Sequence, residues 1–160
     1  MNPTENDMPA KLRAAVAELL NKRLADLIDL QLQTKQAHWN VKGPNFIALH
    51  ELFDSIAEEL EDHVDDVAER ITALGGIAEG TVAAVGKRSS LAAYSLKITA
   101  GRDHVDALST AIALTGKSVR AAIEKADELG DAGTADLLTG ISRDLDKKLW
   151  FVEAHLQGDS

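Results

Sequence analysis

The sequence predicts an all-α fold, a four-helix bundle in which a long crossover joins the second and third helices. In four segments, apolar residues recur at steps of three and four, the period of an amphipathic helix. A glycine-rich stretch, residues 75–95, separates the second segment from the third. No segment shows the convincing alternation of a strand.

The first helix is expected over residues 9–38. Its buried stripe comprises Leu12, Val16, Leu19, Leu20, Leu24, Leu27 and Ile28. The same face continues through Gln31, Thr34 and His38, so it becomes polar toward its end. Considered alone, such an end is more often exposed to solvent than ligand-bearing.

The second helix follows a glycine–proline break and stops at two glycines. Pro44 disfavours helix in the residue before it, and Asn45 is a capping residue type. We expect the helix to run to about Leu74, because Gly75 and Gly76 follow. Its core stripe comprises Leu49, Phe53, Ile56, Leu60, Val64, Val67, Ile71 and Leu74.

The crossover and the third helix come next. Residues 75–95 are too weakly periodic for a long helix, although a short one could form after Ser89 and Ser90. The third helix is expected from about Leu96 to Leu129. Its stripe comprises Val105, Leu108, Ile112, Thr115, Val119, Ala122 and Ala126.

The fourth helix follows a tight connection at Gly130, Asp131 and Gly133. Its stripe comprises Leu138, Ile141, Leu145, Leu149, Val152 and Leu156. Short first and last connections with a long middle one imply two antiparallel hairpins joined by a crossover, the ferritin-like arrangement. The 160 residues are expected to form one domain, with a flexible tail at 1–8 and a short tail at 157–160.

Composition excludes several classes of function. There are no cysteines, so disulfides, thiolate metal sites and cysteine nucleophiles are excluded. The formal net charge of -9 argues against a surface devoted to nucleic acid and suits cations instead. No segment reaches membrane-spanning length, and the N-terminus lacks the features of a secretion signal. We expect a cytoplasmic protein, with nucleoid association left open.

Five residues that can hold a transition metal lie between His38 and Glu69. Besides His38 they form two pairs at a spacing of four, His50 with Asp54 and Asp65 with Glu69. Such pairs share one helical face. Asp54 and Asp65 are eleven residues apart in the sequence. This separation is about 16 Å along a helix, too far for one ion to bridge.

A two-fold axis between two subunits would allow the two pairs to bind one ion despite this separation. Two antiparallel copies of the second helix would set His50 and Asp54 of one copy opposite Asp65 and Glu69 of the other, in two equivalent sites. His38 could add a nitrogen ligand from the first helix. The sequence has no Glu-x-x-His motif, and its core stripes are aliphatic. We therefore expect the metal between subunits rather than inside the bundle.

The ligand types restrict the metal. Two imidazoles with three carboxylates suit iron(II), manganese or zinc, and copper less well. Carboxylates also stabilise the higher charge of oxidised iron, so such a site can favour iron(II) oxidation. Composition alone leaves iron and zinc as alternatives.

Four runs of the sequence carry a resemblance to one family. HWNVKGPNF, LHELFD and DHVDDVAERI closely resemble the ferroxidase signature of the DNA-binding proteins from starved cells, the Dps family of mini-ferritins, and SRDLDKKLWFVE also looks like that family. The resemblance covers essentially the whole chain. It implies a ferroxidase that assembles as a dodecamer, oxidises iron(II) with hydrogen peroxide and more slowly with oxygen, stores ferric mineral, and protects the cell from oxidative damage.

The resemblance also implies the origin of the iron ligands. His38, His50 and Asp54 would come from one subunit, and Asp65 and Glu69 from its two-fold mate.

Further roles follow from the same resemblance. Trp39 would lie near the iron, and Asp127, Asp131 and Asp136 would line an acidic pore through which iron enters. Carboxylates at a helix start are equally expected from the helix dipole. Glu61 shares the ligand face, either as a solvated acid or as a nucleation site for mineral.

The remaining histidines and one aromatic pair are expected to have ordinary roles. His63 lies well around the helix from the ligand stripe, so we expect it at the surface. His104 and His155 have no paired acids and are expected to be structural. Trp150 and Phe151 are expected to pack.

The N-terminus departs from the best-known DNA-binding members of the family, which carry a lysine-rich tail. MNPTENDMPA contains Glu5 and Asp7 and no basic residue, and the C-terminal QGDS is not basic either. We expect weak or no DNA binding by the tails. The alternatives to an iron-storing enzyme are a nucleoid-associated, DNA-compacting protein with secondary metal binding and a purely structural helical oligomer.

Overall fold

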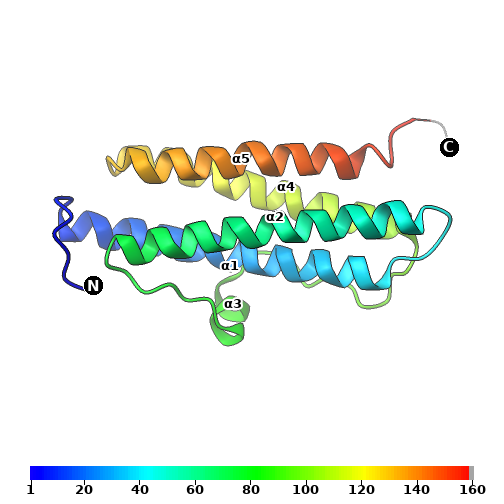
Figure 1. The fold of residues 1–160 in the computed structure, drawn as a ribbon, viewed down its shortest axis with the longest axis horizontal. Coiled ribbons are helices and arrows are strands. Elements are labelled where there is room, and N and C mark those ends of the chain that lie inside the picture. Colours follow the sequence, from blue (N-terminus) through cyan, green and yellow to red (C-terminus); the bar gives the residue numbers. More distant parts are fainter. Residues whose placement is uncertain (159–160) are drawn as a thin grey trace.

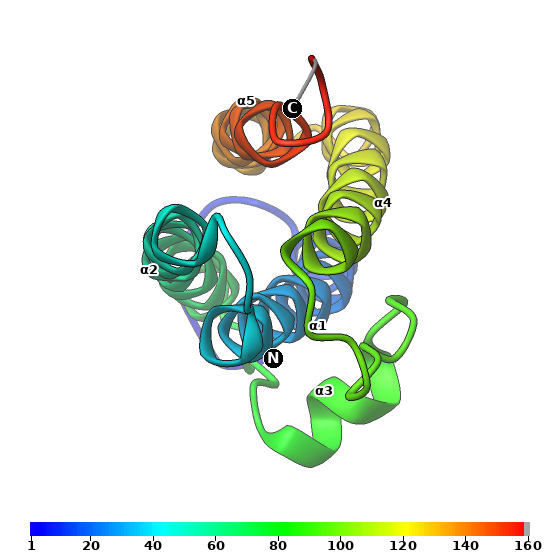
Figure 2. The same cartoon turned by 90° about the vertical axis from the view of Figure 1, so that its right-hand side faces the viewer.

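Two helical hairpins make up the bundle in the computed structural model, which describes residues 1–158 (Figure 1). The helices are α1 (Ala10–Asn40), α2 (Phe46–Ala73), α3 (Val82–Arg88), α4 (Gly101–Glu128) and α5 (Ala132–Glu153). α1 packs on α2 and α4 packs on α5, while α3 lies beside α1 outside the four long helices (Figure 2). The predicted four-helix bundle with a helix in its crossover is confirmed.

The predicted apolar stripes form the core. Phe53, Leu60, Ile112 and Leu138 are at most 1% exposed. The four stripes contribute to one continuous cluster that all four long helices share. Burial of these apolar side chains is the main force holding the hairpins together.

The short helix of the crossover lies before Ser89 and Ser90, not after them as the sequence suggested. Thr81 begins α3 because its hydroxyl accepts a hydrogen bond from the backbone N–H of Ala84. The two serine side chains instead bind carboxylates of α1, so they anchor the chain rather than cap a helix.

α4 begins at Gly101, five residues later than expected. The chain before it is held extended in an isolated bridge to the α1–α2 connection. The Lys42 N–H donates to the Thr99 carbonyl at 2.8 Å, and the Gly101 N–H donates to the Lys42 carbonyl at 3.1 Å. Backbone groups that pair with a distant segment are unavailable to a helix.

Two local expectations were also wrong. Gly133 belongs to α5, not to the connection before it, because α5 begins one residue after its cap, Asp131. Asn45 precedes α2 as expected, but its side chain makes no capping hydrogen bond.

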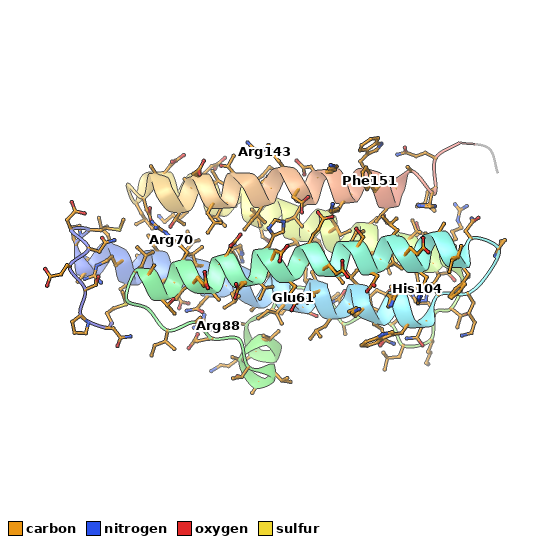
Figure 3. All side chains as sticks on the ribbon, viewed as in Figure 1. Glu61, Arg70, Arg88, His104, Arg143 and Phe151 are labelled. Atoms are coloured by element: carbon orange, nitrogen blue, oxygen red, sulfur yellow. The ribbon has the colours of Figure 1, made fainter. Side chains whose placement is uncertain are left out.

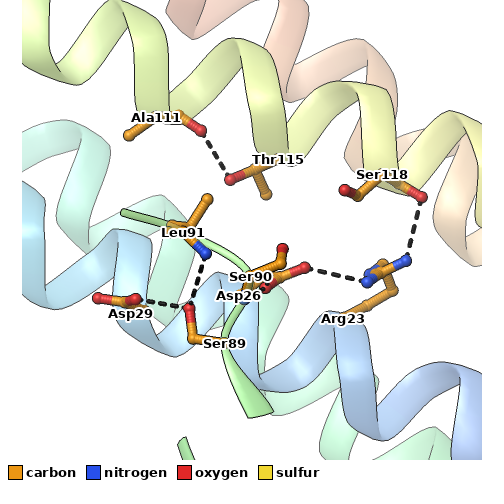
Figure 4. Close-up of polar contacts among 9 residues, drawn as sticks. All are labelled: Arg23, Asp26, Asp29, Ser89, Ser90, Leu91, Ala111, Thr115 and Ser118. Atoms are coloured by element: carbon orange, nitrogen blue, oxygen red, sulfur yellow. Dashed lines mark hydrogen bonds and ion pairs between the residues drawn. The ribbon is translucent and has the colours of Figure 1, made fainter. Parts of the chain in front are cut away.

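A buried carboxylate, that of Asp26, holds the crossover against the bundle (Figure 4). Asp26 is fully buried, and its Oδ1 accepts hydrogen bonds from the N–H and the hydroxyl of Ser90, both at 2.8 Å. The Arg23 guanidinium pairs with Asp26 Oδ2 at 3.1 Å and donates to the Ser118 carbonyl of α4 at 3.4 Å. This network joins α1, the crossover and α4.

The N-terminal residues up to Asp7 are exposed, although the Asn2 N–H donates to the Gly75 carbonyl at 2.7 Å. The flexibility expected for 1–8 stays a prediction, and the expected C-terminal tail lies partly outside the described residues. Within residues 1–158, no helix is both long enough and apolar enough to cross a membrane.

Candidate metal centre

The connection between α1 and α2 brings the first two predicted ligands together. Gly43 adopts a φ of 122°, which favours glycine, and the Phe46 N–H donates to its carbonyl at 3.1 Å. The chain reverses there, so the last turns of α1 lie against the first turns of α2. His38 and His50 consequently face each other, with ring centroids 3.8 Å apart and ring planes 19° apart.

Reciprocal hydrogen bonds fix both imidazoles. His38 Nδ1 lies 2.7 Å from the His50 carbonyl oxygen, and His50 Nδ1 lies 2.8 Å from the His38 carbonyl oxygen. A carbonyl can only accept, so each Nδ1 carries a proton and donates it. In the neutral rings each Nε2 therefore presents a lone pair. A hydrogen bond at the other ring nitrogen is how proteins orient histidine as a metal ligand.

Asp54 lies beside this pair and is held by a lysine. Its Oδ1 is 2.6 Å from Lys35 Nζ and 3.7 Å from His38 Nε2. The Lys35 ammonium holds the pKa of Asp54 below its usual value, against a smaller opposing effect of burial. The carboxylate is therefore ionised near neutral pH. The Lys35 ammonium supplies the positive charge beside it that a bound metal cation would otherwise supply.

We refer to His38, His50 and Asp54 as the half-site. The structure does not bring the second predicted pair, Asp65 and Glu69, to this half-site. Asp65 and Glu69 are exposed further along α2. Among residues 1–158, no three His, Cys, Asp or Glu side chains are placed so that they could hold a metal ion. Asp65 instead lines an open pocket of about 560 Å³ together with Glu61 and Gln31. His38 thus lies against both His50 and Asp54, whereas Asp65 and Glu69 lie elsewhere on α2, and the described part of one subunit holds no complete metal site.

Trp39 is the residue after His38 on α1, and it is 64% exposed. Its proximity to iron stays a prediction. On the other side of the pair, the Phe46 ring lies 5.1 Å from the His50 ring and is 41% exposed. Large apolar side chains therefore remain exposed beside the half-site, where a second subunit could cover them.

Lys35 is a residue at the half-site that the sequence did not lead us to expect there. The sequence does indicate this position, because Lys35 precedes His38 by about one helical turn and so shares its face. A lysine among candidate metal ligands is easily passed over, since it cannot bind a metal while protonated.

Asp131 caps α5 and pairs with Arg70 within the subunit, and its pore role stays a prediction. It is 2% exposed, and its Oδ1 accepts from the Thr134 N–H at 3.0 Å and pairs with Arg70 at 2.8 Å. Burial disfavours its charge, but the hydrogen bonds from Thr134 and Arg70 outweigh this effect, so the pKa of Asp131 lies below its usual value. Asp127 and Asp136 are exposed, and their pore role stays a prediction.

The expectation for His63 was wrong in detail. It is not a free surface residue, because its Nε2 lies 2.6 Å from Asp144 Oδ2 on α5. Lys148 links Asp144, at 3.5 Å, to Glu59 of α2, at 2.5 Å. Burial disfavours the charge of Asp144, yet the His63 hydrogen bond and the Lys148 charge lower its pKa overall. This network ties α2 to α5.

The aromatic pair on α5 is only partly packed. The Trp150 and Phe151 ring centroids are 5.0 Å apart, but Trp150 is 61% exposed. His155 is exposed as well, whereas His104 is buried, as a structural histidine would be.

Comparison with known proteins identifies the family. A family model described as a ferritin-like domain matches residues 17–160. A DNA protection during starvation protein from Agrobacterium fabrum is 49% identical over 157 residues, which cover 98% of this chain and 97% of the relative. This chain belongs to the Dps family. A second relative of the same description, from Mycolicibacterium smegmatis, is 40% identical over 92% of this chain and 80% of its own length.

Solved Dps structures share the fold of the whole chain. Mycobacterium smegmatis Dps in its tetragonal form has a TM-score of 0.93 at 38% identity, covering 98% of this chain and 96% of that chain. A Dps protein from Vibrio cholerae O1, described as a member of a broad superfamily of ferritin-like diiron-carboxylate proteins, has a TM-score of 0.91 at 26% identity, covering 98% of both chains. The Dps assignment therefore applies to nearly the whole chain.

Proposed function

We propose that the protein is an iron(II)-oxidising, iron-storing member of the Dps family that uses hydrogen peroxide as its oxidant. The supporting observation is the half-site itself. Two histidines with free Nε2 lone pairs lie beside an ionised carboxylate, while two further carboxylates sit too far away in the same subunit. Membership of a family that includes ferritin-like diiron-carboxylate proteins supports iron as the substrate.

The complete site would be shared between two subunits. His38, His50 and Asp54 of one subunit would bind iron together with Asp65 and Glu69 of its two-fold mate. The spacing of the two half-sites along α2, about 16 Å, matches this arrangement because an antiparallel α2 would bring the opposite half-site across the axis. The exposed apolar side chains beside the half-site would become buried in the interface.

The residues would act mainly through charge. Three carboxylates stabilise iron(III) more than iron(II), so they lower the cost of oxidation, and the imidazoles complete a donor set suited to iron. Iron(II) would displace the Lys35 ammonium from Asp54, exchanging one positive partner for another. Two iron(II) ions each give up one electron, and hydrogen peroxide accepts both as its O–O bond breaks to form water or hydroxide.

Storage requires the oxidised product to remain enclosed. We propose a dodecameric shell in which ferric mineral collects, with Glu61 near the site as a candidate for nucleation and Asp127 and Asp136 at an acidic pore. Removal of iron(II) and peroxide together would protect the cell from oxidative damage. Manganese or zinc could occupy the same ligands and would then inhibit oxidation.

Stopped-flow oxidation of iron(II) tests this function. Wild-type protein, mixed anaerobically with iron(II) and limiting peroxide, should form iron(III) rapidly, and more slowly with oxygen. Asp65→Ala and Glu69→Ala should each lose most of this rate, while Asp62→Ala, an exposed acid on the same helix, should not. Absence of iron(II) binding to the wild type in an anaerobic titration would reject the proposal.

A further inference from the structure

Tyr94 and His104 form a hydrogen-bonded pair that the metal centre does not use. Tyr94, in the crossover, is the one tyrosine of the sequence, and His104 lies in the first turn of α4. The Tyr94 hydroxyl oxygen is 2.6 Å from His104 Nδ1, and the two rings are nearly parallel. His104 is 1% exposed. The pair thus combines an oxidisable phenol with a buried base.

The tautomer of His104 determines the direction of the hydrogen bond. Its Nε2 is buried without a hydrogen-bond partner among residues 1–158. A neutral imidazole carries its proton on one ring nitrogen only. We assign the proton to Nε2, which leaves the lone pair on Nδ1, 2.6 Å from the Tyr94 hydroxyl oxygen. Nδ1 is then the acceptor, and Tyr94 donates.

At rest, both groups are uncharged. Burial raises the pKa of Tyr94 well above its ordinary value. Burial likewise lowers the pKa of His104, and the nearby Asp103 charge only partly opposes this effect. The proton therefore stays on the phenol until an electron is removed. Loss of an electron makes a phenol strongly acidic, and the base that would receive its proton is already in contact.

The pair lies at the end of the bundle that carries the metal half-site. Lys42, four residues after His38, is bridged to Ala100, and the His104 N–H donates to the Ala100 carbonyl at 3.1 Å. Figure 3 shows His104 at this end, where α1 finishes. Tyr94 also lines an open cavity of about 270 Å³ beside Gln33, so small molecules can approach it.

We propose that Tyr94 and His104 form a radical sink that quenches one-electron oxidants escaping from the reaction of iron(II) with peroxide. A hydroxyl radical takes one electron from Tyr94 and becomes hydroxide, while the phenolic proton moves to His104 Nδ1. The products are a neutral tyrosyl radical and an imidazolium. Iron(II) then returns an electron to the radical and becomes iron(III), and His104 returns the proton. The source of the oxidant rests on the proposed function.

Pulse radiolysis of the full-length, metal-free protein tests the pair independently of iron. Azide radicals should oxidise Tyr94 to a tyrosyl radical, which Tyr94→Phe abolishes. His104→Gln keeps a hydrogen-bonding side chain but removes the base. Tyrosyl formation should therefore slow by about 100-fold, the lower limit of the effect expected for a positioned base. His155→Gln, an exposed histidine, is the matched control and should behave as wild type. Equal rates in wild type and His104→Gln would overturn the proposal.

Freeze-quench EPR then tests the role in turnover. Wild type mixed with iron(II) and peroxide should show a tyrosyl signal, and Tyr94→Phe should accumulate more oxidative damage at its tryptophans. Ferric product without a tyrosyl signal would overturn the radical sink and leave the proposed function standing. No ferric product would overturn the proposed function, and the azide experiment would still decide whether the pair is redox-active.

Discussion

Replacement of Asp131 separates a capping role from a pore role. Asp131→Ala removes the cap of α5, worth about 1 kcal/mol, and leaves Arg70 without its buried carboxylate partner. Arg70 is 28% exposed and can regain water, so we assign its loss about another 1 to 2 kcal/mol. The total of roughly 2 to 3 kcal/mol corresponds to a decrease in Tm of about 5 to 10 °C for a chain of this size.

Asp131→Asn isolates the charge. Asparagine caps as well as aspartate does, so this variant should lose only the ion pair, about 1 kcal/mol. The pKa of Asp131 is lowered by folding from 3.8, so its charge stabilises the protein above that pH, and this contribution disappears as the pH falls through the folded-state pKa. The difference between wild type and Asp131→Asn should therefore vanish in acid.

Urea unfolding at equal protein concentration, from pH 7 down to pH 3, measures these differences, with the exposed Asp136→Ala as control. Asp136→Ala should be within about 0.5 kcal/mol of wild type. An Asp131→Ala variant as stable as wild type but slower in iron uptake would refute the capping argument and restore the pore role.

Three further predictions follow from the same contacts. Lys35→Gln should bind iron(II) several-fold more tightly than wild type at pH 7 in an anaerobic titration, because the cation no longer competes with an ammonium for Asp54; weaker binding would contradict this. Asp26→Ala should lose about 3 kcal/mol in chemical unfolding, because the Ser90 N–H and Arg23 lose a buried partner; a loss below about 1 kcal/mol would show that water replaces the carboxylate. Duplex DNA at physiological salt should not be retarded in a gel by the full-length protein, and a clear shift would overturn the expectation from the acidic N-terminus.

Much of the fold could be predicted because it depends on local patterns. The period of the apolar residues located four long helices, and glycines marked the end of α2 and the last connection. The start of α4 could not be found this way, since it depends on backbone pairing between Lys42 and the chain around Ala100. The helix in the crossover was misplaced for a similar reason, because the Ser89 and Ser90 hydroxyls donate to carboxylates of α1, a distant segment.

The candidate site, too, could be predicted where it depends on local spacing but not where it depends on contacts between distant segments. A spacing of four predicted that His50 and Asp54 share a face, and the helical rise predicted that Asp65 lies out of reach. The stacking of His50 on His38 depends on the conformation of the α1–α2 connection, which spacing does not specify. The contact between His63 and its partner on α5 was also beyond reach, because the sequence does not state which faces of separate helices meet.

Mixed assemblies test the shared site most directly. Co-assembly of His50→Ala with Glu69→Ala subunits places both defects in one site of each mixed two-fold pair and leaves the other site intact. Random pairing then restores about a quarter of the wild-type number of sites. We predict that the mixture recovers about that share of the wild-type rate of iron(II) oxidation by peroxide, while each variant alone is nearly inactive. A mixture no faster than the separate variants would contradict an intersubunit site.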